Sequence, residues 1–284
     1  MKIGSSDISA AYIGSTAINK IYIGSTEVWS AVDPDAQAFF DRVTTAGGSL
    51  STTEQEAVNT LVVQMKTDGI WTKMKAVYPM VGASAAACAQ NLKSSSFTGT
   101  FNGGWTFSST GSKPNGTSGY MDTNLTPSGN LSSNNNHLSF YSRTQNSSVS
   151  GINIGSFRDS TNEIWMSVYY AAVSQKVYVA GGYGNNKAFI NNTNTLGMHI
   201  GSQTSTNSRK LYFAGSLVNT NTTNYSHTYS TNPIYIGAHN NGSAFLFMPH
   251  ECAFSSIGDG LTDTEASDFY TAVQAFQATL SRQV

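Results

Sequence analysis

Charged side chains are scarce in this sequence of 284 residues. Asp, Glu, Lys and Arg make up 11% of the chain, against roughly 25% in an average globular protein, and the formal net charge is −1. The sequence contains no cluster of Lys or Arg and no basic helix, which argues against a nucleic-acid partner. Its polar surface must come from Ser, Thr, Asn and Gly instead, and that composition suits a rigid all-β exterior.

Long apolar segments and cysteines are also few. No stretch approaches the roughly 18 apolar residues of a membrane span. Met1-Lys2 leads directly into strand-like sequence, so we expect no signal peptide. The only cysteines are Cys88 and Cys252, which excludes a disulfide-based scaffold and predicts two buried, reduced thiols. The length is sufficient for one large domain or two modest ones with an ample core.

A ten-residue repeat fills the start of the chain. The motif KIGSSDI, which begins at Lys2, returns as YIGSTAI and YIGSTEV, so that Gly4, Gly14 and Gly24 are each followed by Ser. Gly-Ser between apolar, β-branched runs is typical of a two-residue hairpin turn. We therefore predict an N-terminal β-meander with a turn at each of these three glycines.

Both faces of this meander carry large apolar residues, and so few strands cannot bury them in water. Sibling copies or another protein must cover them, so we interpret residues 1–32 as an attachment segment. The side chains expected to anchor this contact are Tyr12, Ile13, Ile21, Tyr22, Ile23 and Trp29.

Two amphipathic helices are predicted between residues 33 and 69, as a short connector. Asp33-Pro34 places an N-cap residue before a proline at the first helical position. Ser51 and Glu54 have the spacing of a capping box at the start of the second helix.

From residue 70 onward, short apolar runs alternate with Gly, Asn, Ser and Thr turns, which predicts a two-sheet sandwich. A second capping box, Thr262 to Glu265, and an apolar stripe that includes Phe269 and Tyr270 predict a closing helix over residues 262–281, packed on the sandwich. The expected strands are Lys75–Val81, Gly104–Phe107, Tyr120–Thr123, His137–Arg143, Gly151–Phe157, Glu163–Tyr170, Lys176–Ala180, Met198–Gly201, Lys210–Phe213, Pro233–Gly237 and Phe245–Phe254.

Several of these segments resemble a domain of virion and tail-fibre proteins of tailed bacteriophages. The resemblance is carried by GGWTFSSTGSKPNGTSGYMDT (103–123), HLSFYSR (137–143), KLYFAGSLV (210–218), IYIGAHNNG (234–242) and the C-terminal segment from residue 254. That domain is an antiparallel jelly-roll β-sandwich of the concanavalin A-like or laminin-G-like type. The N-terminal YIGST repeats also resemble N-terminal segments of such phage proteins.

The resemblance implies a mainly β protein with an attachment segment (1–32), a helical connector (33–69) and a lectin-like jelly roll with its closing helix (70–284). It implies a virion structural protein, as a tail fibre, a receptor-binding protein or a head fibre, attached by its N-terminus to other virion proteins. Made in the host cytoplasm, it would be displayed on the particle as a homo-oligomer, with a trimer as the expected state. Its lectin-like domain would adhere to a host-surface glycan.

A carbohydrate-active hydrolase with an N-terminal docking module is the alternative. Glycosidases need two carboxyl groups roughly 5–10 Å apart, and acids are sparse in the predicted sandwich. Asp159 and Glu163 are four residues apart, but the Ser-Thr-Asn between them is typical of a turn. We therefore expect no enzymatic activity and assign no catalytic residue.

Metal and cofactor sites are not expected either. His250-Glu251-Cys252 contains ligand-type residues, but the other histidines are scattered and no zinc-site spacing occurs. Trp105 and Trp165 lie in strand-like runs and are expected in the core.

Exposed loops on a rigid sandwich are the usual place for recognition, and Asn and aromatic side chains suit sugars. The alternative is that these Asn-rich loops serve turn geometry alone. The candidate glycan-binding residues are Asn135, Asn136, Tyr183, Asn185, Asn186, Tyr225, Tyr229, Asn240 and Asn241.

Overall fold

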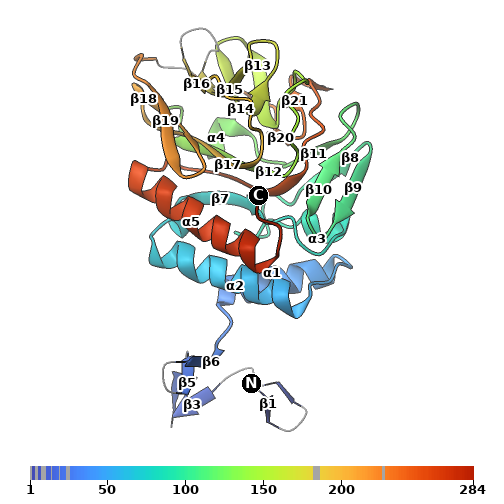
Figure 1. The fold of residues 1–284 in the computed structure, drawn as a ribbon, viewed down its shortest axis with the longest axis vertical. Coiled ribbons are helices and arrows are strands. Elements are labelled where there is room, and N and C mark those ends of the chain that lie inside the picture. Colours follow the sequence, from blue (N-terminus) through green and yellow to red (C-terminus); the bar gives the residue numbers. More distant parts are fainter. Residues whose placement is uncertain are drawn as a thin grey trace.

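Three layers make up the body of the protein in the computed structural model (Figure 1). A layer of helices lies on one face of an eight-stranded sheet, and a seven-stranded sheet covers the other face. All strand pairs are antiparallel, which confirms the predicted β-sandwich. The structure describes residues 2–3, 6–7, 11–13, 15–18, 20–23, 26–181, 186–225 and 228–284.

The eight-stranded sheet lies in the middle of the body. Its strand order is β19-β18-β17-β12-β23-β10-β9, and β7 also pairs with β23. The first and last strands of the sandwich, β7 and β23, therefore pair in one sheet, which is typical of a jelly roll. The strands are β7 (Met74–Tyr78), β9 (Trp105–Ser108), β10 (Gly111–Pro114), β12 (Asn136–Ser142), β17 (Gly197–Ser205), β18 (Ser208–Phe213), β19 (Ser216–Asn221) and β23 (Cys252–Gly258).

The seven-stranded sheet forms the outer layer and has the order β16-β15-β14-β13-β20-β11-β8. A separate two-stranded hairpin, β21 (His239–Asn240) and β22 (Ala244–Phe245), accompanies it. The seven strands are β8 (Thr100–Asn102), β11 (Tyr120–Asp122), β13 (Ile154–Asp159), β14 (Asn162–Tyr170), β15 (Gln175–Gly181), β16 (Lys187–Ile190) and β20 (Tyr235–Ile236).

Strand β14 shows how the sequence fixes which side chains face inward. Successive side chains of a strand point to opposite faces of the sheet. Ile164, Met166 and Val168 are fully buried between the two sheets. Trp165 and Glu163 therefore point to the outer face of the seven-stranded sheet.

The helices begin where their capping residues predict. The Asp33 side chain accepts a hydrogen bond at the start of α1, and Ser51 with Glu54 forms a complete capping box at α2. Thr262 and Glu265 repeat that capping box at the closing helix α5, as predicted. The helical elements are α1 (Pro34–Thr45), α2 (Thr52–Thr67), the 3-10 turn η1 (Trp71–Lys73), α3 (Ala85–Cys88), α4 (Pro127–Asn130) and α5 (Asp263–Thr279).

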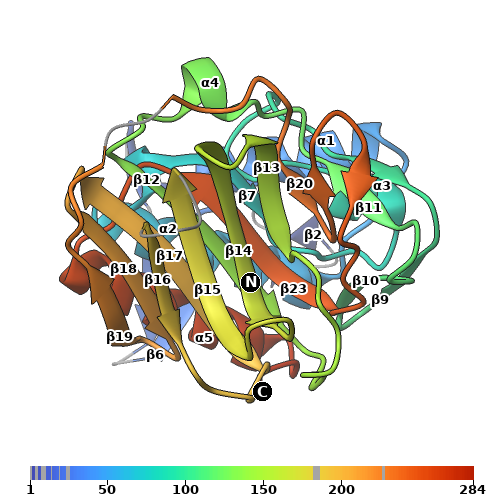
Figure 2. The same ribbon diagram turned by 90° about the horizontal axis from the view of Figure 1, so that it is seen from above.

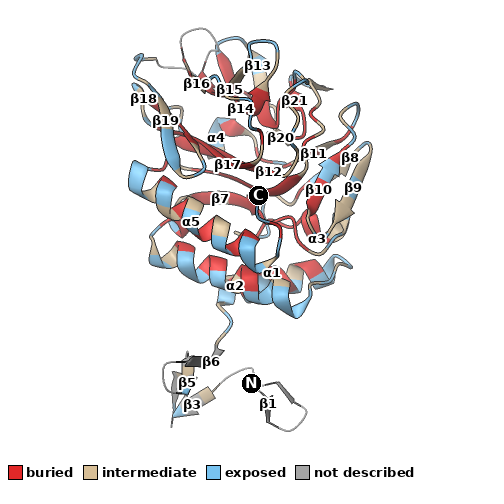
Figure 3. Ribbon diagram, in the orientation of Figure 1, coloured by how far each residue is buried: buried red, intermediate tan, exposed pale blue. Residues whose placement is uncertain are grey.

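Helices α1 and α2 pack against the body of the protein and do not form a separate connector. Their apolar faces share one core with α5 and the eight-stranded sheet, and their polar faces are exposed (Figure 3). Phe39, Leu61 and Phe269 come from the three helices, and Phe254 and Tyr212 come from the sheet. The predicted helical connector is thus a packed layer, because its apolar stripe needs the sheet to cover it.

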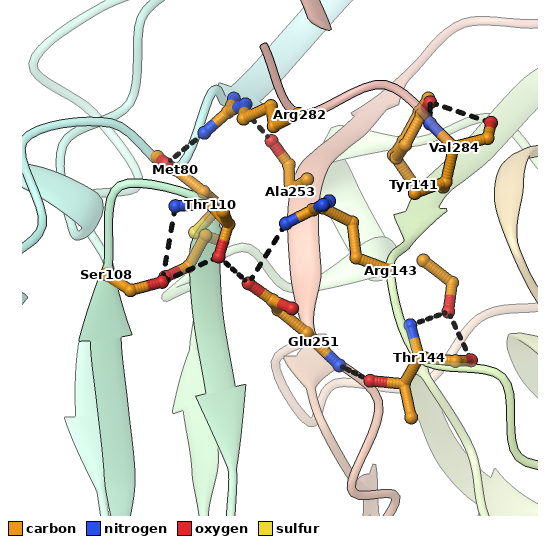
Figure 4. A network of polar contacts seen from close by, with 12 residues as sticks. Met80, Ser108, Thr110, Tyr141, Arg143, Thr144, Glu251, Ala253, Arg282 and Val284 are labelled. Carbon is orange, nitrogen blue, oxygen red and sulfur yellow. Dashed lines mark hydrogen bonds and ion pairs between the residues drawn. The ribbon is translucent and has the colours of Figure 1, made fainter. Parts of the chain in front are cut away.

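A polar network fixes the C-terminus beneath the sheet (Figure 4). The Arg282 guanidinium is 1% exposed and donates to the carbonyls of Met80 and Ala253, both at 2.8 Å. Burial lowers the pKa of Arg282 to about 10. The Val284 backbone N–H donates to the Tyr141 hydroxyl at 3.0 Å. These bonds hold the end of the closing helix against β23 and β12.

The predicted strand Phe245–Phe254 is wrong, because two separate strands occupy this region. Phe245 ends β22, whereas β23 begins at Cys252 in the other sheet. Leu246 takes a positive φ of 51°, and Pro249 has no N–H to pair, so the ladder breaks between them. Strands that the sequence analysis missed are β8, β10, β16, β19 and β21.

Paired strands flank each predicted Gly-Ser turn in the N-terminal repeats, although the turn residues themselves, apart from Ser15, lie outside the described residues. The residues on either side of each turn pair: Ile3 with Ser6, Ile13 with Thr16, and Ile23 with Thr26. The described strands form three separate two-stranded sheets, which corrects the single meander that we expected, since only the turns impose pairing locally. The strands are β1 (Lys2–Ile3), β2 (Ser6–Asp7), β3 (Ala11–Ile13), β4 (Thr16–Ile18), β5 (Lys20–Ile23) and β6 (Thr26–Ser30).

Candidate functional site

The outer face of the seven-stranded sheet, which is turned toward the viewer in Figure 2, carries an aromatic cluster around Trp165. Val179 of β15 pairs directly with Trp165, and Val177 lies on the same face. Both valines are fully buried, and Trp165 is 4% exposed. This small core lies on the side of the sheet that faces away from the helices. It therefore supports a ligand site on the outer surface of the protein.

The β21–β22 hairpin folds over β13 and brings His239 beside Trp165. The Gly237 N–H donates to the Asn153 carbonyl at 2.8 Å, which ties the start of the hairpin to the sheet. Gly155 pairs with Trp165, and a Cβ at this glycine would lie 2.4 Å from the Trp165 Cβ and 3.1 Å from His239 Cδ2. Glycine at position 155 is therefore what allows His239 to approach the sheet here.

A pocket of about 190 Å³ opens between this hairpin and strand β14. Its walls come from two sequence regions that are far apart: the β13–β14 hairpin with the residue Ile152 before it, and the β21–β22 hairpin with Leu246 directly after it. The described residues that line it are Ile152, Phe157, Glu163, Trp165, Tyr170, His239, Phe245 and Leu246.

Neighbouring rings around the pocket meet mostly at steep angles. The Trp165 ring lies 5.8 Å from Tyr170 at 64° and 6.0 Å from His239 at 62°. The Phe157 ring lies 5.4 Å from His239 at 64° and 6.1 Å from Phe245 at 71°. His239 and Phe245 are stacked, with their centroids 5.1 Å apart. Adjacent walls at such angles bring ring edges and ring faces to several sides of the pocket.

Two buried polar side chains line the pocket. Glu163 is 4% exposed, and its Oε2 accepts a hydrogen bond of 2.8 Å from Trp165 Nε1. His239 is 3% exposed, and its Nε2 has no hydrogen-bond partner among the described residues. The Ser156 backbone favours a proton on this imidazole, and a neutral imidazole has one donor and one acceptor nitrogen.

Burial lowers the pKa of His239 to about 3, although the Ser156 backbone opposes this shift. The imidazole is therefore neutral near pH 7. No Lys or Arg is among the described residues that line the pocket. The Glu163 carboxylate is the one formally charged group in this lining.

A second aromatic pair lies on the same face of the sheet, outside the pocket. Tyr120 of β11 and Tyr235 of β20 stack with centroids 4.4 Å apart at 22°. Burial, with the nearby Asp122 carboxylate and Tyr120, raises the pKa of Tyr235 to about 12. Burial also raises the pKa of Asp122. This pair offers a comparison for the pocket, since it is aromatic but neither ring is among the residues that line the pocket.

The asparagines of the first predicted glycan-binding loop make hydrogen bonds within the protein. Asn136 is fully buried, donates to the Tyr229 hydroxyl at 2.6 Å and accepts from the Tyr178 hydroxyl, so it has no group left for an external sugar. Asn135 is exposed, but its Oδ1 accepts from the Gly260 N–H at 2.8 Å. The prediction for Asn136 is wrong, because its amide completes a network between the two sheets.

The predicted pair Asn240 and Asn241 shapes a turn. Asn240 is 1% exposed, donates to the Pro233 carbonyl at 2.8 Å and accepts from the Gly242 N–H at 2.9 Å. The prediction that Asn240 binds a glycan is therefore wrong. Asn241 is exposed and accepts from the Ser243 N–H at 3.3 Å. Turn geometry, the alternative raised from the sequence, accounts for both side chains.

The remaining candidates are divided by burial. Tyr229 is 5% exposed and bonded inside the sandwich, which rules out its predicted role. Asn186 is 5% exposed, and Tyr225 is half-buried. Tyr183 and Asn185 lie outside the described residues.

The sequence analysis missed the pocket. Trp165 is buried in a core, as expected, but that core is a small one on the outer face of the sheet, where Trp165 lines the pocket with Phe157 and Tyr170. Strict alternation with Ile164 and Met166 was the available signal, because it assigns Trp165 to the opposite face. No local pattern could have placed the β21–β22 hairpin over this strand.

The suspected metal motif is structural. His250 is buried, its Nε2 bonds the Asn146 carbonyl at 2.9 Å, and burial lowers its pKa to about 4. Cys252 and Cys88 are buried free thiols, as predicted. Among the described residues, no group of three or more His, Cys, Asp or Glu side chains could hold a metal ion.

Asp159 and Glu163, the two acids considered for the hydrolase alternative, lie in different environments. Asp159 is at the β13–β14 turn, where its Oδ1 accepts from the Thr161 hydroxyl at 2.6 Å, from the Thr161 N–H at 3.0 Å and from Asn162 Nδ2 at 2.8 Å. These hydrogen bonds, together with Arg158, hold the pKa of Asp159 well below its usual range. Glu163 instead turns into the aromatic pocket.

Part of the predicted attachment surface is visible in the N-terminal hairpins. Ile13 is 75% exposed and Ile23 is 68% exposed, whereas Ile21 is half-buried. Exposed isoleucines at successive hairpins leave an apolar surface uncovered. The side chains of three further predicted anchors lie outside the described residues: Tyr12, Tyr22 and Trp29.

No protein-family model and no curated protein matches the sequence. Solved structures, in contrast, share the fold. Domain 4 of AbnA, a GH43 extracellular arabinanase from Geobacillus stearothermophilus solved in complex with arabinotriose, superposes with a TM-score of 0.50 at 15% identity. The match covers 69% of this chain and 98% of that domain.

Botulinum neurotoxin type C, whose cell entry depends on interaction with two ganglioside molecules, superposes with a TM-score of 0.52 at 11% identity. The match covers 73% of this chain and 53% of that chain, so this protein spans about half of it. Both likenesses confirm the jelly-roll-like lectin fold that the sequence predicted. Among the described residues, no helix is long and apolar enough to cross a membrane.

Proposed function

We propose that the chain is an adhesion protein whose sandwich binds a host-surface glycan, with the pocket around Trp165 as its ligand site. The observation that carries this proposal is the aromatic pocket on the outer face of the seven-stranded sheet. Ligand sites are typically concave and mostly apolar, with a few polar groups that orient the ligand, and Glu163 and His239 supply such groups here. A related fold that was solved with arabinotriose adds support.

The N-terminal hairpins are proposed to attach the protein to a tailed-phage particle. Exposed Ile13 and Ile23 support this role, because isolated two-stranded hairpins are marginally stable and need partners to cover their apolar faces. The partners would be other virion proteins and sibling chains, with a trimer as the expected state. The protein would then be displayed on the surface of the virion, as a tail fibre, a receptor-binding protein or a head fibre.

We propose binding without hydrolysis. A glycosidase places two carboxyl groups about the scissile bond, roughly 5–10 Å apart. The described lining of the pocket supplies one carboxylate, from Glu163, and Asp159 is engaged at a turn outside that lining. The hydrolase alternative therefore has no specific observation in its favour.

Binding to purified host-surface polysaccharide tests the proposal, with the full-length protein immobilised on a biosensor. Trp165→Ala should abolish binding, whereas Tyr235→Ala, which removes an aromatic side chain from the same face outside the pocket, should retain it. Equal binding by both variants would move the site away from the pocket. Release of new reducing ends by the wild-type protein would establish the hydrolase alternative instead.

A further inference from the structure

The pocket around Trp165 has the chemistry of a site for a positively charged ligand. We propose that it binds a compact organic cation, an alkylated ammonium group such as that of choline, carried by the host-surface polymer. This inference rests on the proposed adhesion function and names the chemical class of its ligand.

The size of the pocket favours one small group over a length of glycan. Its volume is about 190 Å³, below the roughly 300–1,000 Å³ of pockets for drug-sized ligands. The walls are aromatic rings of Trp165, Tyr170, Phe157 and Phe245 that stand at steep angles to their neighbours. An alkylated ammonium is roughly spherical and can touch rings on several sides at once, whereas a flat sugar ring uses one or two parallel faces.

The aromatic faces, the Glu163 carboxylate and the His239 imidazole make the lining electron-rich. Aromatic faces attract cations through their quadrupole, and Trp is the strongest of them. Glu163 adds a carboxylate that is held in place by Trp165 Nε1 at 2.8 Å. His239 adds an imidazole whose buried Nε2 has no hydrogen-bond partner among the described residues. The lining contains no described Lys or Arg to oppose a bound cation.

A neutral sugar would find few partners in the same space. A hexose carries several hydroxyl groups, and each loses a hydrogen bond to water when it is buried without a replacement. Among the side chains of the described lining, those of Glu163, Trp165, Tyr170 and His239 carry polar groups, and Trp165 Nε1 already donates to Glu163. A methylated ammonium makes little such demand, because its charge is spread over its methyl groups and needs acceptors rather than matched donors.

Isothermal titration of the full-length protein with choline chloride tests this inference against a matched neutral probe. The neutral probe is the carbon isostere of choline, in which a tert-butyl group replaces the trimethylammonium. The two ligands have the same shape and differ in charge. We expect choline to bind at least about tenfold more tightly, because cation–π attraction strengthens in a desolvated site.

Two variants separate charge from shape. Glu163→Gln keeps an acceptor for Trp165 Nε1 and should weaken choline binding by about tenfold, while binding of the neutral isostere stays unchanged. Tyr170→Ala removes a half-buried wall and should weaken both ligands. Tyr235→Ala, outside the pocket, should change neither. Circular dichroism of each variant verifies the fold, and Tyr170→Ala keeps the test decisive if Glu163→Gln is unstable.

The outcomes distinguish this inference from the proposed function. Equal affinity for choline and its isostere, or no choline binding, would overturn the cation site. Adhesion to host polysaccharide that requires Trp165 but is not competed by choline would leave the adhesion function standing and refute the cation. If the wild-type protein binds neither choline nor the polysaccharide, both the cation site and the adhesion function are refuted.

Discussion

Removal of the Phe269 ring should destabilise the whole body of the protein. Phe269 is fully buried between the closing helix α5 and the eight-stranded sheet, as the sequence predicted. Its ring lies 5.8 Å from the Phe254 ring at 63°, and 6.2 Å from the His137 ring at 71°. Helices α1 and α2 share the same core, so a cavity here is bounded by several elements at once.

The expected cost of Phe269→Ala is about 3–5 kcal/mol of the free energy of unfolding. This value combines the lost burial of the ring with the cavity that a rigid sheet cannot close. The edge-to-face contact with Phe254 supports a value in the upper part of the range, because such pairs contribute about 0.5–1.5 kcal/mol beyond area burial. Domains are typically stable by only about 5–15 kcal/mol, so the variant retains a small margin.

Urea unfolding followed by tryptophan fluorescence and by far-ultraviolet circular dichroism measures this cost. The matched control is Ser267→Ala on the exposed face of the same helix, which should change stability by less than about 0.5 kcal/mol. Coincident transitions from the two probes would show that the body unfolds as one unit. A cost below about 1 kcal/mol for Phe269→Ala would refute the reasoning, since it would mean that α5 does not share the main core.

Three further predictions follow from the structure. Burial lowers the pKa of both His137 and His250 to about 4, below the usual value near 6.5, so the unfolded state binds more protons between these limits. Stability should therefore be complete above about pH 6.5 and fall towards pH 4, by up to about 3 kcal/mol per histidine; an unfolding midpoint in urea that does not move over this range would contradict it. Cys88 and Cys252 should resist a thiol reagent until the protein is unfolded, because burial raises the pKa of both thiols. Deletion of residues 1–30 should leave a soluble body with an unchanged unfolding transition that no longer joins the particle, and truncated protein at normal copy number in purified particles would place attachment elsewhere.

Local signals in the sequence were sufficient for the helices and for the N-terminal turns. The capping boxes at Ser51 and Thr262 appear in the structure where the sequence placed them, since a cap involves residues only three positions apart. The strands on either side of the Gly-Ser pairs likewise have the register that a two-residue turn predicts. The short strands β8 and β21 escaped notice, because segments of two or three residues carry no periodicity of their own.

The asparagines show which features cannot be predicted from the local sequence. Asn136 and Asn240 belong to sequence that is typical of exposed loops, yet both are buried and hydrogen-bonded. Their partners, Tyr229 and Pro233, are distant in sequence or reached only after the chain has folded back. A polar side chain is exposed or buried according to what packs over it, and that information is not local.

The sequence by itself determined the class of fold, the capped helices, the hairpin turns and the burial of Phe269, because each depends on composition or on contacts between near neighbours. Only the tertiary structure decided where the candidate site lies. Trp165 and Glu163 come from one strand, but His239 and Phe245 reach them through a hairpin about 75 residues later, over a glycine that leaves room for the approach. Such a pocket exists only when distant segments are brought side by side, so no pattern along the chain could have specified it.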